Sequence, residues 1–230
     1  MTTNLQERIQ HVNDRIAAAC ARAGRRPEEV GVIAVTKYVS METTGAALDQ
    51  GLTQIGENRW QDAAAKWEAY GSRATWHFIG HLQTNKVKEV VGRFHYIHSL
   101  DRLSLAKEIE KKAAGLGITV PCFLQLNISG EESKYGMEPE ALMDFVSELR
   151  GSCPHIRIEG LMTMAPYEAE PEETRPVFRG LREQRDRLNA SGLLDYEVRG
   201  LSMGMSNDFE VAIEEGATWV RLGTVLVGKE

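Results

Sequence analysis

The sequence predicts an α/β protein in which eight parallel strands and their connecting helices close into a single barrel, a (β/α)8 or TIM-type barrel. Short apolar runs alternate with longer segments of helical period along the whole chain, and 230 residues lie near the short end of this fold's size range. No Gly-x-Gly-x-x-Gly motif follows the first strand, where a dinucleotide-binding open sheet carries its phosphate loop. A doubly wound open sheet is therefore the second choice.

Eight runs have strand character, because each is short, apolar and enriched in β-branched or aromatic residues. The expected strands span residues 31–36, 53–57, 75–80, 95–98, 119–127, 156–162, 196–202 and 218–222. The first of them (GVIAVT) is apolar almost throughout, which is typical of a strand that is covered on both faces.

Seven segments of helical period follow the first seven strands, and one more precedes them. The expected helices span residues 5–24, 41–50, 58–70, 84–92, 101–114, 138–150, 171–190 and 206–215. Asp101, Pro139 and Ser206 are suitable signals for the starts of three of them. The N-terminal helix has one apolar face and can end at Gly24, so we expect it to replace the helix that would follow the eighth strand.

The composition indicates a soluble globular chain with one domain over residues 1–230, since 42% of the residues are hydrophobic and 26% are charged. The net charge of −6 comes from dispersed charges without a basic block, so we expect no nucleic-acid partner. No apolar stretch approaches the roughly 20 residues of a membrane span, and the N-terminus lacks the apolar core of a signal peptide. We therefore expect a cytoplasmic protein without membrane contact. Its three cysteines, an odd number without Cys-x-x-Cys spacing, are expected to be reduced.

Lys37 is the first residue that needs a chemical explanation. It follows the apolar run 31–36 directly, where a buried strand passes into a polar loop. A partly desolvated ammonium group loses its proton more easily than one in water, and a neutral amine can form a Schiff base with an aldehyde. Lys37 is therefore a candidate for covalent cofactor binding. The alternative is a strand-end lysine whose amine reaches solvent.

Two segments rich in glycine and hydroxyl side chains follow the last two expected strands. They are 202–206 (SMGMS) and 221–224 (RLGT). Glycine lets a backbone approach an anion closely, while hydroxyls and free N–H groups donate hydrogen bonds to it. Because the loops after strands 7 and 8 of this fold commonly bind phosphate, we expect a phosphate site here rather than two ordinary turns.

Strand 1, which Lys37 ends, adjoins strand 8 once the barrel closes. A lysine able to form a Schiff base then lies beside a phosphate site, the combination that pyridoxal 5′-phosphate requires. Arg221 is the expected partner of either the pyridine nitrogen or the phosphate. Facing the nitrogen, its guanidinium would keep that atom unprotonated and make the ring a weaker electron sink. The alternative for Arg221 is a surface charge at a strand end.

Other expected strand ends carry polar residues as well. His77 and His81 lie four apart, but this segment reads as a strand entering a loop and no third ligand is evident, so we expect no metal site. Met162 is expected to pack in the core or to lie against a flat ring. Lys134 is expected to be a solvated charge, with a second amine that guards the site as the alternative.

With these residues assembled, the chain resembles the pyridoxal phosphate homeostasis protein family. The resemblance rests on VTKYVS around Lys37, GENR at 56–59, WHFIGHLQTNK at 76–86, GLMTM at 160–164, LSMGMSNDFE at 201–210 and VRLGT at 220–224. The family's fold is similar to the N-terminal barrel domain of alanine racemase. The resemblance implies that the chain binds pyridoxal 5′-phosphate as an aldimine.

The resemblance also assigns roles to individual residues. The cofactor-binding residues that it implies are Lys37, Asn58, Met162, Ser202, Gly204, Ser206, Arg221, Gly223 and Thr224. Lys37 would form the Schiff base, and the serines, glycines and threonine would contact the phosphate. Arg221 would contact the ring nitrogen or the phosphate, and Asn58 and Met162 would line the ring. The pair 38–39 (YV) departs from many relatives, which is expected to alter the pocket rim only.

Racemisation on this cofactor needs a base on each face of the substrate's α-carbon, and Lys37 can serve only one. Related racemases take the opposite base, a tyrosine, from a second domain across a dimer, and we expect no such domain after Glu230. We therefore expect the family's role, a monomer that holds pyridoxal phosphate and supplies it to apo-enzymes in vitamin B6 homeostasis without strong turnover. One alternative is a small racemase or related enzyme with Tyr167 as second base. The other is a sugar-phosphate enzyme in which Lys37 is a general acid or Schiff-base residue.

Overall fold

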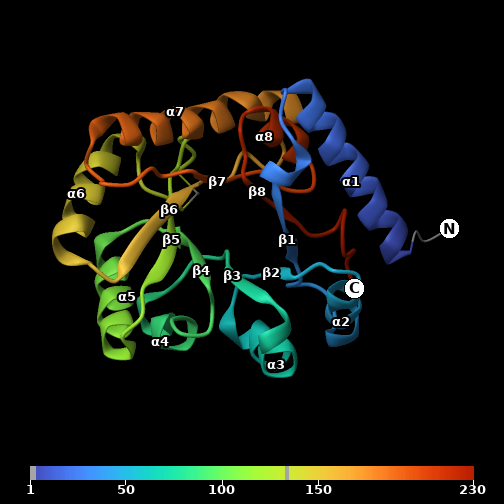
Figure 1. The fold of residues 1–230 in the computed structure, drawn as a ribbon, viewed down its shortest axis with the longest axis horizontal. Coiled ribbons are helices and arrows are strands. Elements are labelled where there is room, and N and C mark those ends of the chain that lie inside the picture. The colour runs from blue at the N-terminus through green and yellow to red at the C-terminus, as the bar shows by residue number, and fades with distance from the viewer. Residues whose placement is uncertain (1–3, 133–134) are drawn as a thin grey trace.

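A computed structural model describes residues 4–132 and 135–230 as a ring of strands surrounded by helices (Figure 1). The strands are parallel and pair in chain order, and the last pairs with the first, so the sheet is a closed barrel. They are β1 (Gly31–Val35), β2 (Gln54–Glu57), β3 (Thr75–Phe78), β4 (Tyr96–Leu100), β5 (Val120–Gln125), β6 (Ile156–Met162), β7 (Gly200–Ser202) and β8 (Trp219–Leu222). The expected barrel is confirmed and the open sheet is excluded. Lys134 lies outside the described residues.

The helices cover the outer face of the barrel (Figure 1). They are α1 (Leu5–Arg22), α2 (Met41–Asp49), α3 (Trp60–Tyr70), α4 (Val87–Val90), α5 (Leu103–Leu116), α6 (Leu142–Ser152), α7 (Arg175–Ser191) and α8 (Phe209–Glu214). The additional N-terminal helix α1 packs against α8, where the Arg15 guanidinium lies 4.6 Å from the centre of the Phe209 ring. Gly24 follows its end with a left-handed φ of +64°, as expected.

Two of the expected helix starts are wrong. Helix α5 begins at Leu103 after Arg102, and the carboxylate of Asp101 instead accepts hydrogen bonds from the Arg102 side chain and the Gly136 amide. Helix α8 begins after Asp208 rather than after Ser206. Pro139 does open a helical turn, a short 3-10 segment that leads into α6.

Strand β7 is shorter than expected, and Val198, within the expected span 196–202, pairs with a helix side chain instead of with a strand. The amide of Asn189 in α7 donates to the Val198 carbonyl at 2.8 Å and accepts from the Val198 N–H at 2.8 Å. The backbone N–H and C=O of Val198 are therefore satisfied without the strand ladder. Helix α4 is also shorter than the expected span 84–92, because a 3-10 turn at Thr84–Lys86 precedes it.

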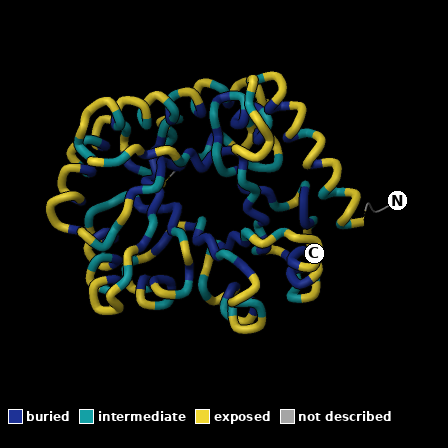
Figure 2. Tube along the Cα trace, viewed as in Figure 1, coloured by how far each residue is buried: buried dark blue, intermediate teal, exposed yellow. Residues whose placement is uncertain are grey.

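The strands form the buried centre of the molecule and the outer faces of the helices are exposed (Figure 2). Phe123 crosses the barrel interior beside two glycines of neighbouring strands. A Cβ atom at Gly160 or Gly200 would lie 2.6 Å from its ring, so both positions need glycine. Within the described part of the chain, no helix combines the length and apolar character needed to cross a membrane.

Candidate functional site

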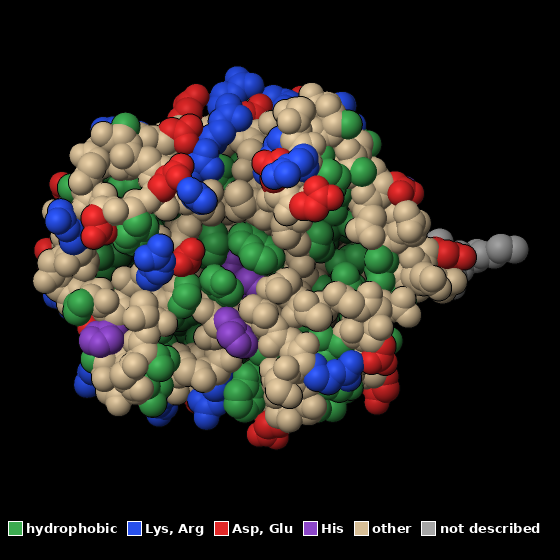
Figure 3. All heavy atoms as spheres, viewed as in Figure 1, with side chains coloured by type: hydrophobic (Ala, Val, Ile, Leu, Met, Phe, Trp, Pro, Cys, Tyr) green, Lys and Arg blue, Asp and Glu red, His purple; other side chains and the backbone are tan. Residues whose placement is uncertain are grey.

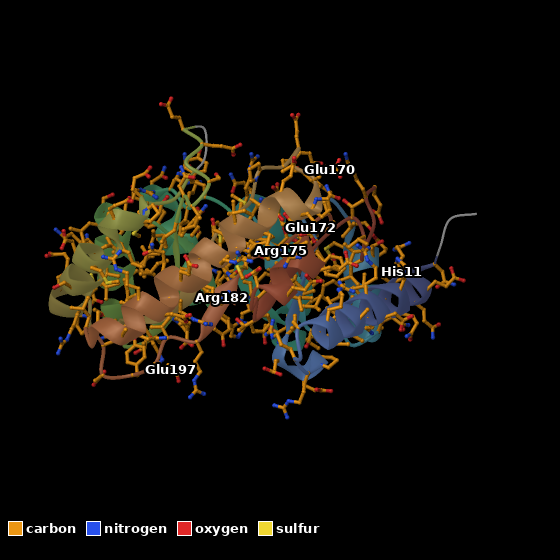
Figure 4. All side chains as sticks on the ribbon, turned by 90° about the horizontal axis from the view of Figure 1, so that it is seen from above. His11, Glu170, Glu172, Arg175, Arg182 and Glu197 are labelled. Carbon is orange, nitrogen blue, oxygen red and sulfur yellow. The ribbon has the colours of Figure 1, made fainter. Side chains whose placement is uncertain are left out.

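The residues selected from the sequence gather at the carboxyl end of the barrel. Lys37 follows β1, Asn58 follows β2, Met162 ends β6, and the two glycine-containing segments end or follow β7 and β8. Figure 4 shows the barrel from the side, with Glu170, in the loop after β6, and Glu197, before β7, at opposite ends. The loops that follow the strands, and the selected residues with them, therefore lie at the end of the barrel that carries Glu170.

Lys37 occupies a turn directly after β1 and is half-buried. Its Nζ atom lies 4.8 Å from the centre of the Tyr38 ring. Strand β1 pairs with β8 so that Ala34 lies opposite Leu222, which brings the turn at Lys37 beside the loop after β8. Lys37 therefore lies at the carboxyl end of the barrel, next to the loop after β8.

A buried ion pair holds the backbone just before Lys37. The Lys66 Nζ atom lies 3.0 Å from Glu57 Oε1 and donates to the Thr36 carbonyl at 2.5 Å. The Thr36 hydroxyl donates to the same carboxylate oxygen at 2.5 Å. The three residues are 0 to 6% exposed, so they connect β1, β2 and α3 through polar contacts that exclude water.

None of the motifs at the strand ends predicted this cluster, although the sequence of α3 contains a signal for it. Ala63, Lys66 and Tyr70 share a face of α3, because they are three and four residues apart. Ala63 is fully buried, so a lysine on the same stripe must find a buried partner.

The loop after β7 has a shape that only glycine permits. Gly204 has a φ of +96°, and a Cβ atom there would lie 2.7 Å from the Cβ of Ala212. Its carbonyl accepts a hydrogen bond from the Arg221 amide at 2.9 Å, and the Met205 amide donates to Asp208 Oδ1 at 2.6 Å. The loop is thereby bent tightly over the start of α8.

The loops after β7 and β8 lie side by side. The Val225 amide donates to the Ser206 hydroxyl at 3.4 Å, which joins the two loops. The Gly223 carbonyl accepts from the Leu226 and Val227 amides at 2.9 and 2.8 Å, so the second loop closes on itself. Thr224 is exposed at the tip of this turn. Hydroxyls, amides and glycines are thus concentrated in one small area that suits a phosphate group.

Arg221 lies inside the mouth of the barrel and is 3% exposed, so the alternative of a surface charge is wrong. Its guanidinium donates to Ser202 Oγ at 2.7 Å and to the Thr163 carbonyl at 3.0 Å. Burial lowers the pKa of Arg221 to about 10, against the opposing effect of Asp208. The side chain is therefore still a cation at neutral pH.

The side chains of Ser202 and Met162 are fully buried at the ends of neighbouring strands. Ser202 Oγ lies 2.7 Å from the Arg221 guanidinium and 2.8 Å from His98 Nδ1. The hydroxyl is directed into the barrel, whereas Ser206 contacts the loop after β8. The phosphate contact expected for Ser202 stays a prediction.

A cavity of about 520 Å³ opens on the same face, beside the ends of β2 and β3. The residues that line it are Asn58, Arg59, Trp60, Gln61, Phe78, Ile79, Gly80, His81, Leu82, Gln83, Lys86, Val90, Gln125, Tyr135 and Met164. Gly80 packs on Asn58, since a Cβ atom there would lie 2.3 Å from the Asn58 carbonyl oxygen. His81 stacks on Tyr135 at this cavity, whereas His77 lies inside the barrel, so the two histidines do not form a pair.

The donor set fits a ligand that carries an aldehyde, a flat ring and a phosphate. It combines one half-buried lysine, a buried guanidinium and two adjoining loops that carry glycine and hydroxyl residues. These features, at the carboxyl end of a (β/α)8 barrel, define the class of barrel found in alanine racemases. Residues 8–230 match the family model described as alanine racemase, N-terminal domain.

Comparison with curated proteins gives a narrower family. The pyridoxal phosphate homeostasis protein of Aquifex aeolicus is 46% identical over 229 residues, covering 98% of each chain. That of Pseudomonas aeruginosa is 42% identical over 231 residues, covering 98% of this chain and 96% of the relative. The structure of PipY from Synechococcus elongatus with pyridoxal phosphate bound superposes with a TM-score of 0.81 at 34% identity, covering 94% of this chain and 100% of PipY. The chain belongs to the pyridoxal phosphate homeostasis protein family.

Proposed function

We propose that this chain binds pyridoxal 5′-phosphate covalently through Lys37 and takes part in intracellular pyridoxal phosphate homeostasis. The Nζ atom of Lys37 condenses with the aldehyde carbon, a C=N bond forms and one water leaves. The observation that carries the proposal is the half-buried amine beside the two joined loops and the buried cation of Arg221. The family relationship and the ligand bound to PipY support the same ligand here.

The remaining residues of the set position the cofactor in this proposal. Gly204, Gly223, Thr224 and Ser206 contact the phosphate, and Ser202 supports the site through its hydrogen bond with Arg221. Their loops supply amides, hydroxyls and two glycines, which suits an anion.

The ring lies between Asn58 and Met162, with the guanidinium of Arg221 at the pyridine nitrogen. Arg221 donates to two neutral acceptors, Ser202 Oγ and the Thr163 carbonyl, and Asp208 acts on its charge without being one of them. A permanent cation at that nitrogen disfavours its protonation and weakens the ring as an electron sink.

We further propose a carrier rather than an enzyme, acting as a monomer in the cytoplasm and passing the cofactor to apo-enzymes. The tyrosine considered as a second base, Tyr167, is 78% exposed and is turned to solvent. A general base must lie within hydrogen-bond reach of the proton that it removes, in a site where water is excluded. The reversible C=N bond lets a second amine displace Lys37, which suits release of the cofactor.

Two measurements on the loaded protein test this function. Mixing it with the apo form of a pyridoxal phosphate enzyme should restore that enzyme's activity, while a Lys37→Ala variant treated in the same way should restore much less. Incubation with amino acids in deuterium oxide should give little α-deuterium. Rapid α-deuterium incorporation would instead support the small racemase, and no binding of pyridoxal phosphate would favour a sugar-phosphate ligand.

A further inference from the structure

A chain of hydrogen bonds crosses the barrel interior from Arg221 to the opposite end. Arg221 donates to Ser202 Oγ at 2.7 Å, and Ser202 Oγ lies 2.8 Å from His98 Nδ1. His98 Nε2 lies 2.9 Å from His77 Nδ1, and His77 Nε2 lies 2.7 Å from Gln54 Oε1. Five strands, β8, β7, β4, β3 and β2, each contribute one residue to this chain.

The order of donors in this chain follows from its two ends. Arginine can only donate, so Ser202 Oγ accepts from Arg221 and its own proton is free for His98 Nδ1. His98 then carries its proton on Nε2 and donates to His77 Nδ1. His77 in turn donates from Nε2 to the side-chain carbonyl of Gln54. With this order every member of the chain is satisfied, and both imidazoles are neutral Nε2–H tautomers.

The opposite order leaves one proton without an acceptor. It requires the Gln54 amide to rotate and donate, so that both imidazoles carry their proton on Nδ1. Ser202 would then accept from both Arg221 and His98. Its hydroxyl proton would be left over in a fully buried position, which is costly.

Aromatic rings enclose both imidazoles. His98 stacks on Phe123 with ring centres 4.3 Å apart, and His77 stacks on Tyr96 at 4.8 Å. Trp219 lies against His77 at 5.1 Å. The same three aromatic residues line a hollow of about 500 Å³ at the N-terminal end of the barrel, where Figure 3 shows hydrophobic side chains gathered around histidine. Burial lowers the pKa of His77 to about 3, and burial with the charge of Arg221 holds that of His98 well below its ordinary value.

We propose that His98 and His77 are positioning residues that orient Arg221 towards the cofactor ring through Ser202, with Gln54 as the fixed end of the chain. The inference rests on the proposed function, because it concerns how the site holds the pyridine ring. The chain aligns the guanidinium through neutral acceptors, and the carboxylate that acts on its charge, Asp208, is not a member of the chain. The charge of Arg221 therefore remains available to the ligand.

The first test needs no cofactor. Nitrogen-15 shifts of the imidazoles in the unloaded protein should show His98 and His77 as Nε2–H tautomers that do not titrate between pH 5.5 and 8. Protonation on Nδ1, or titration of either ring in that range, would overturn the proposed order of hydrogen bonds. This result does not depend on whether pyridoxal phosphate binds.

The second test compares two replacements of His98. In His98→Leu, Ser202 loses its acceptor, and we expect the Kd for pyridoxal phosphate to rise about tenfold, or about 1.4 kcal/mol, with a shifted absorbance maximum of the bound cofactor. In His98→Asn, the side-chain oxygen occupies the place of Nδ1 and still accepts from Ser202. We expect this variant to bind within about threefold of the wild type with an unshifted maximum.

The outcomes of the second test separate a positioning role of His98 from a merely structural one. Unchanged affinity and absorbance in a folded His98→Leu variant would overturn the positioning role, and so would equal losses in both variants. If His98→Leu does not fold, His77→Gln replaces it, with an expected threefold rise in Kd and a smaller absorbance shift. If the wild type does not bind pyridoxal phosphate, the proposed function is wrong. The tautomers of His98 and His77 would still decide whether the chain of hydrogen bonds has the proposed order.

Discussion

The turn that carries Lys37 depends on a second lysine that the ligand never needs to touch. Lys66 is 6% exposed and its Nζ atom contacts both Glu57 and the Thr36 carbonyl. The second oxygen of this carboxylate, Glu57 Oε2, is buried and has no hydrogen-bond partner among the residues that the structure describes. A buried pair of this kind adds little net stability compared with apolar residues, but breaking it leaves a charge uncompensated. The expected role of the Lys66–Glu57 pair is to hold the ends of β1 and β2 in register next to Lys37.

We therefore expect Lys66→Met to lower the free energy of unfolding by about 3 to 5 kcal/mol, because Glu57 loses its partner. Urea unfolding at pH 7 measures this. Lys86→Met is the matched control, because the Lys86 side chain is 38% exposed and its Nζ atom lies 3.7 Å from Glu89. We expect this variant to lower the free energy of unfolding by less than about 1 kcal/mol. A double variant, Lys66→Met with Glu57→Leu, should recover most of the loss. Equal losses for Lys66→Met and Lys86→Met would contradict the buried role.

Among the elements, α7, α8 and α1 are joined by arginine–carboxylate pairs along one side of the barrel. Arg15 and Arg22 of α1 contact Glu210 and Glu214 of α8 at 2.9 and 2.6 Å. Arg175 at the start of α7 contacts both Glu172 and Glu214, and Figure 4 shows Arg175 close to Glu172. These contacts seat the first and last helices of the chain next to each other, where the barrel closes.

Glu215 is the most buried carboxylate of this group, with a side chain only 6% exposed. Three arginines of α7, Arg175, Arg179 and Arg182, approach it within 3.1 to 3.3 Å. Burial alone would raise its pKa, but the hydrogen bonds from the arginines outweigh burial and lower it. We expect Glu215→Gln to destabilise the fold by about 2 kcal/mol at low salt and by less in 1 M salt.

The matched control for that substitution is Glu197→Gln. Glu197 pairs with Arg199 at 2.9 Å, but the two side chains are 61% and 82% exposed. Thermal unfolding at two salt concentrations should show less than about 0.5 kcal/mol for this variant. A loss of similar size at both positions would argue against the joining role of Glu215.

Most elements could be predicted from local pattern, and two of the errors arise where a residue elsewhere in the chain binds the segment. The strand 156–162 has the bounds that were predicted, and its sequence (IRIEGLM) begins with alternating apolar and charged residues, which is typical of a strand. The strand expected at 196–202 was too long, since nothing near it in sequence indicates that Asn189 binds its backbone. Asp101 resembles a helix cap, but its carboxylate is engaged by Gly136, thirty-five residues away. The expected start of α5 was therefore wrong because a distant residue competes for the carboxylate of Asp101.

At the scale of the whole molecule, closure of the barrel creates contacts that no local pattern contains. The loops with Ser206 and Thr224 could be predicted because the fold class assigns a place to each strand end. The chain from Gln54 to Arg221 could not, because its members come from five strands and meet only inside the closed barrel. The same holds for the contact of Lys66 with Glu57.

Two neutral histidines in the barrel make the fold sensitive to mild acid. His77 has a folded pKa of about 3 and His98 one well below its ordinary value, while unfolded histidine titrates near 6.5. Below about pH 6.5 the unfolded chain takes up protons that the folded chain does not, so the free energy of unfolding falls towards pH 3. Between pH 7 and 5.5 the pair should contribute a loss of about 2 kcal/mol.

Urea midpoints at the two pH values measure this loss. His98→Asn should remove about half of the pH dependence, whereas replacement of the exposed His11 by Gln should leave it unchanged. The position of His11 on α1, away from the barrel, is visible in Figure 4. A wild-type protein of equal stability at pH 7 and 5.5 would contradict the neutral burial of the pair.

The central claim, a covalent bond between Lys37 and pyridoxal phosphate, is tested most directly by borohydride reduction of the loaded protein followed by peptide mass analysis. Reduction of the C=N bond fixes the cofactor on the lysine that carries it. The control is Lys229→Ala, because the Lys229 amine also lies near the Tyr38 ring, 5.8 Å from its centre. We expect the reduced cofactor on the Lys37 peptide in wild type and in Lys229→Ala, and none in Lys37→Ala. Label on another lysine, or undiminished label in Lys37→Ala, would contradict the account.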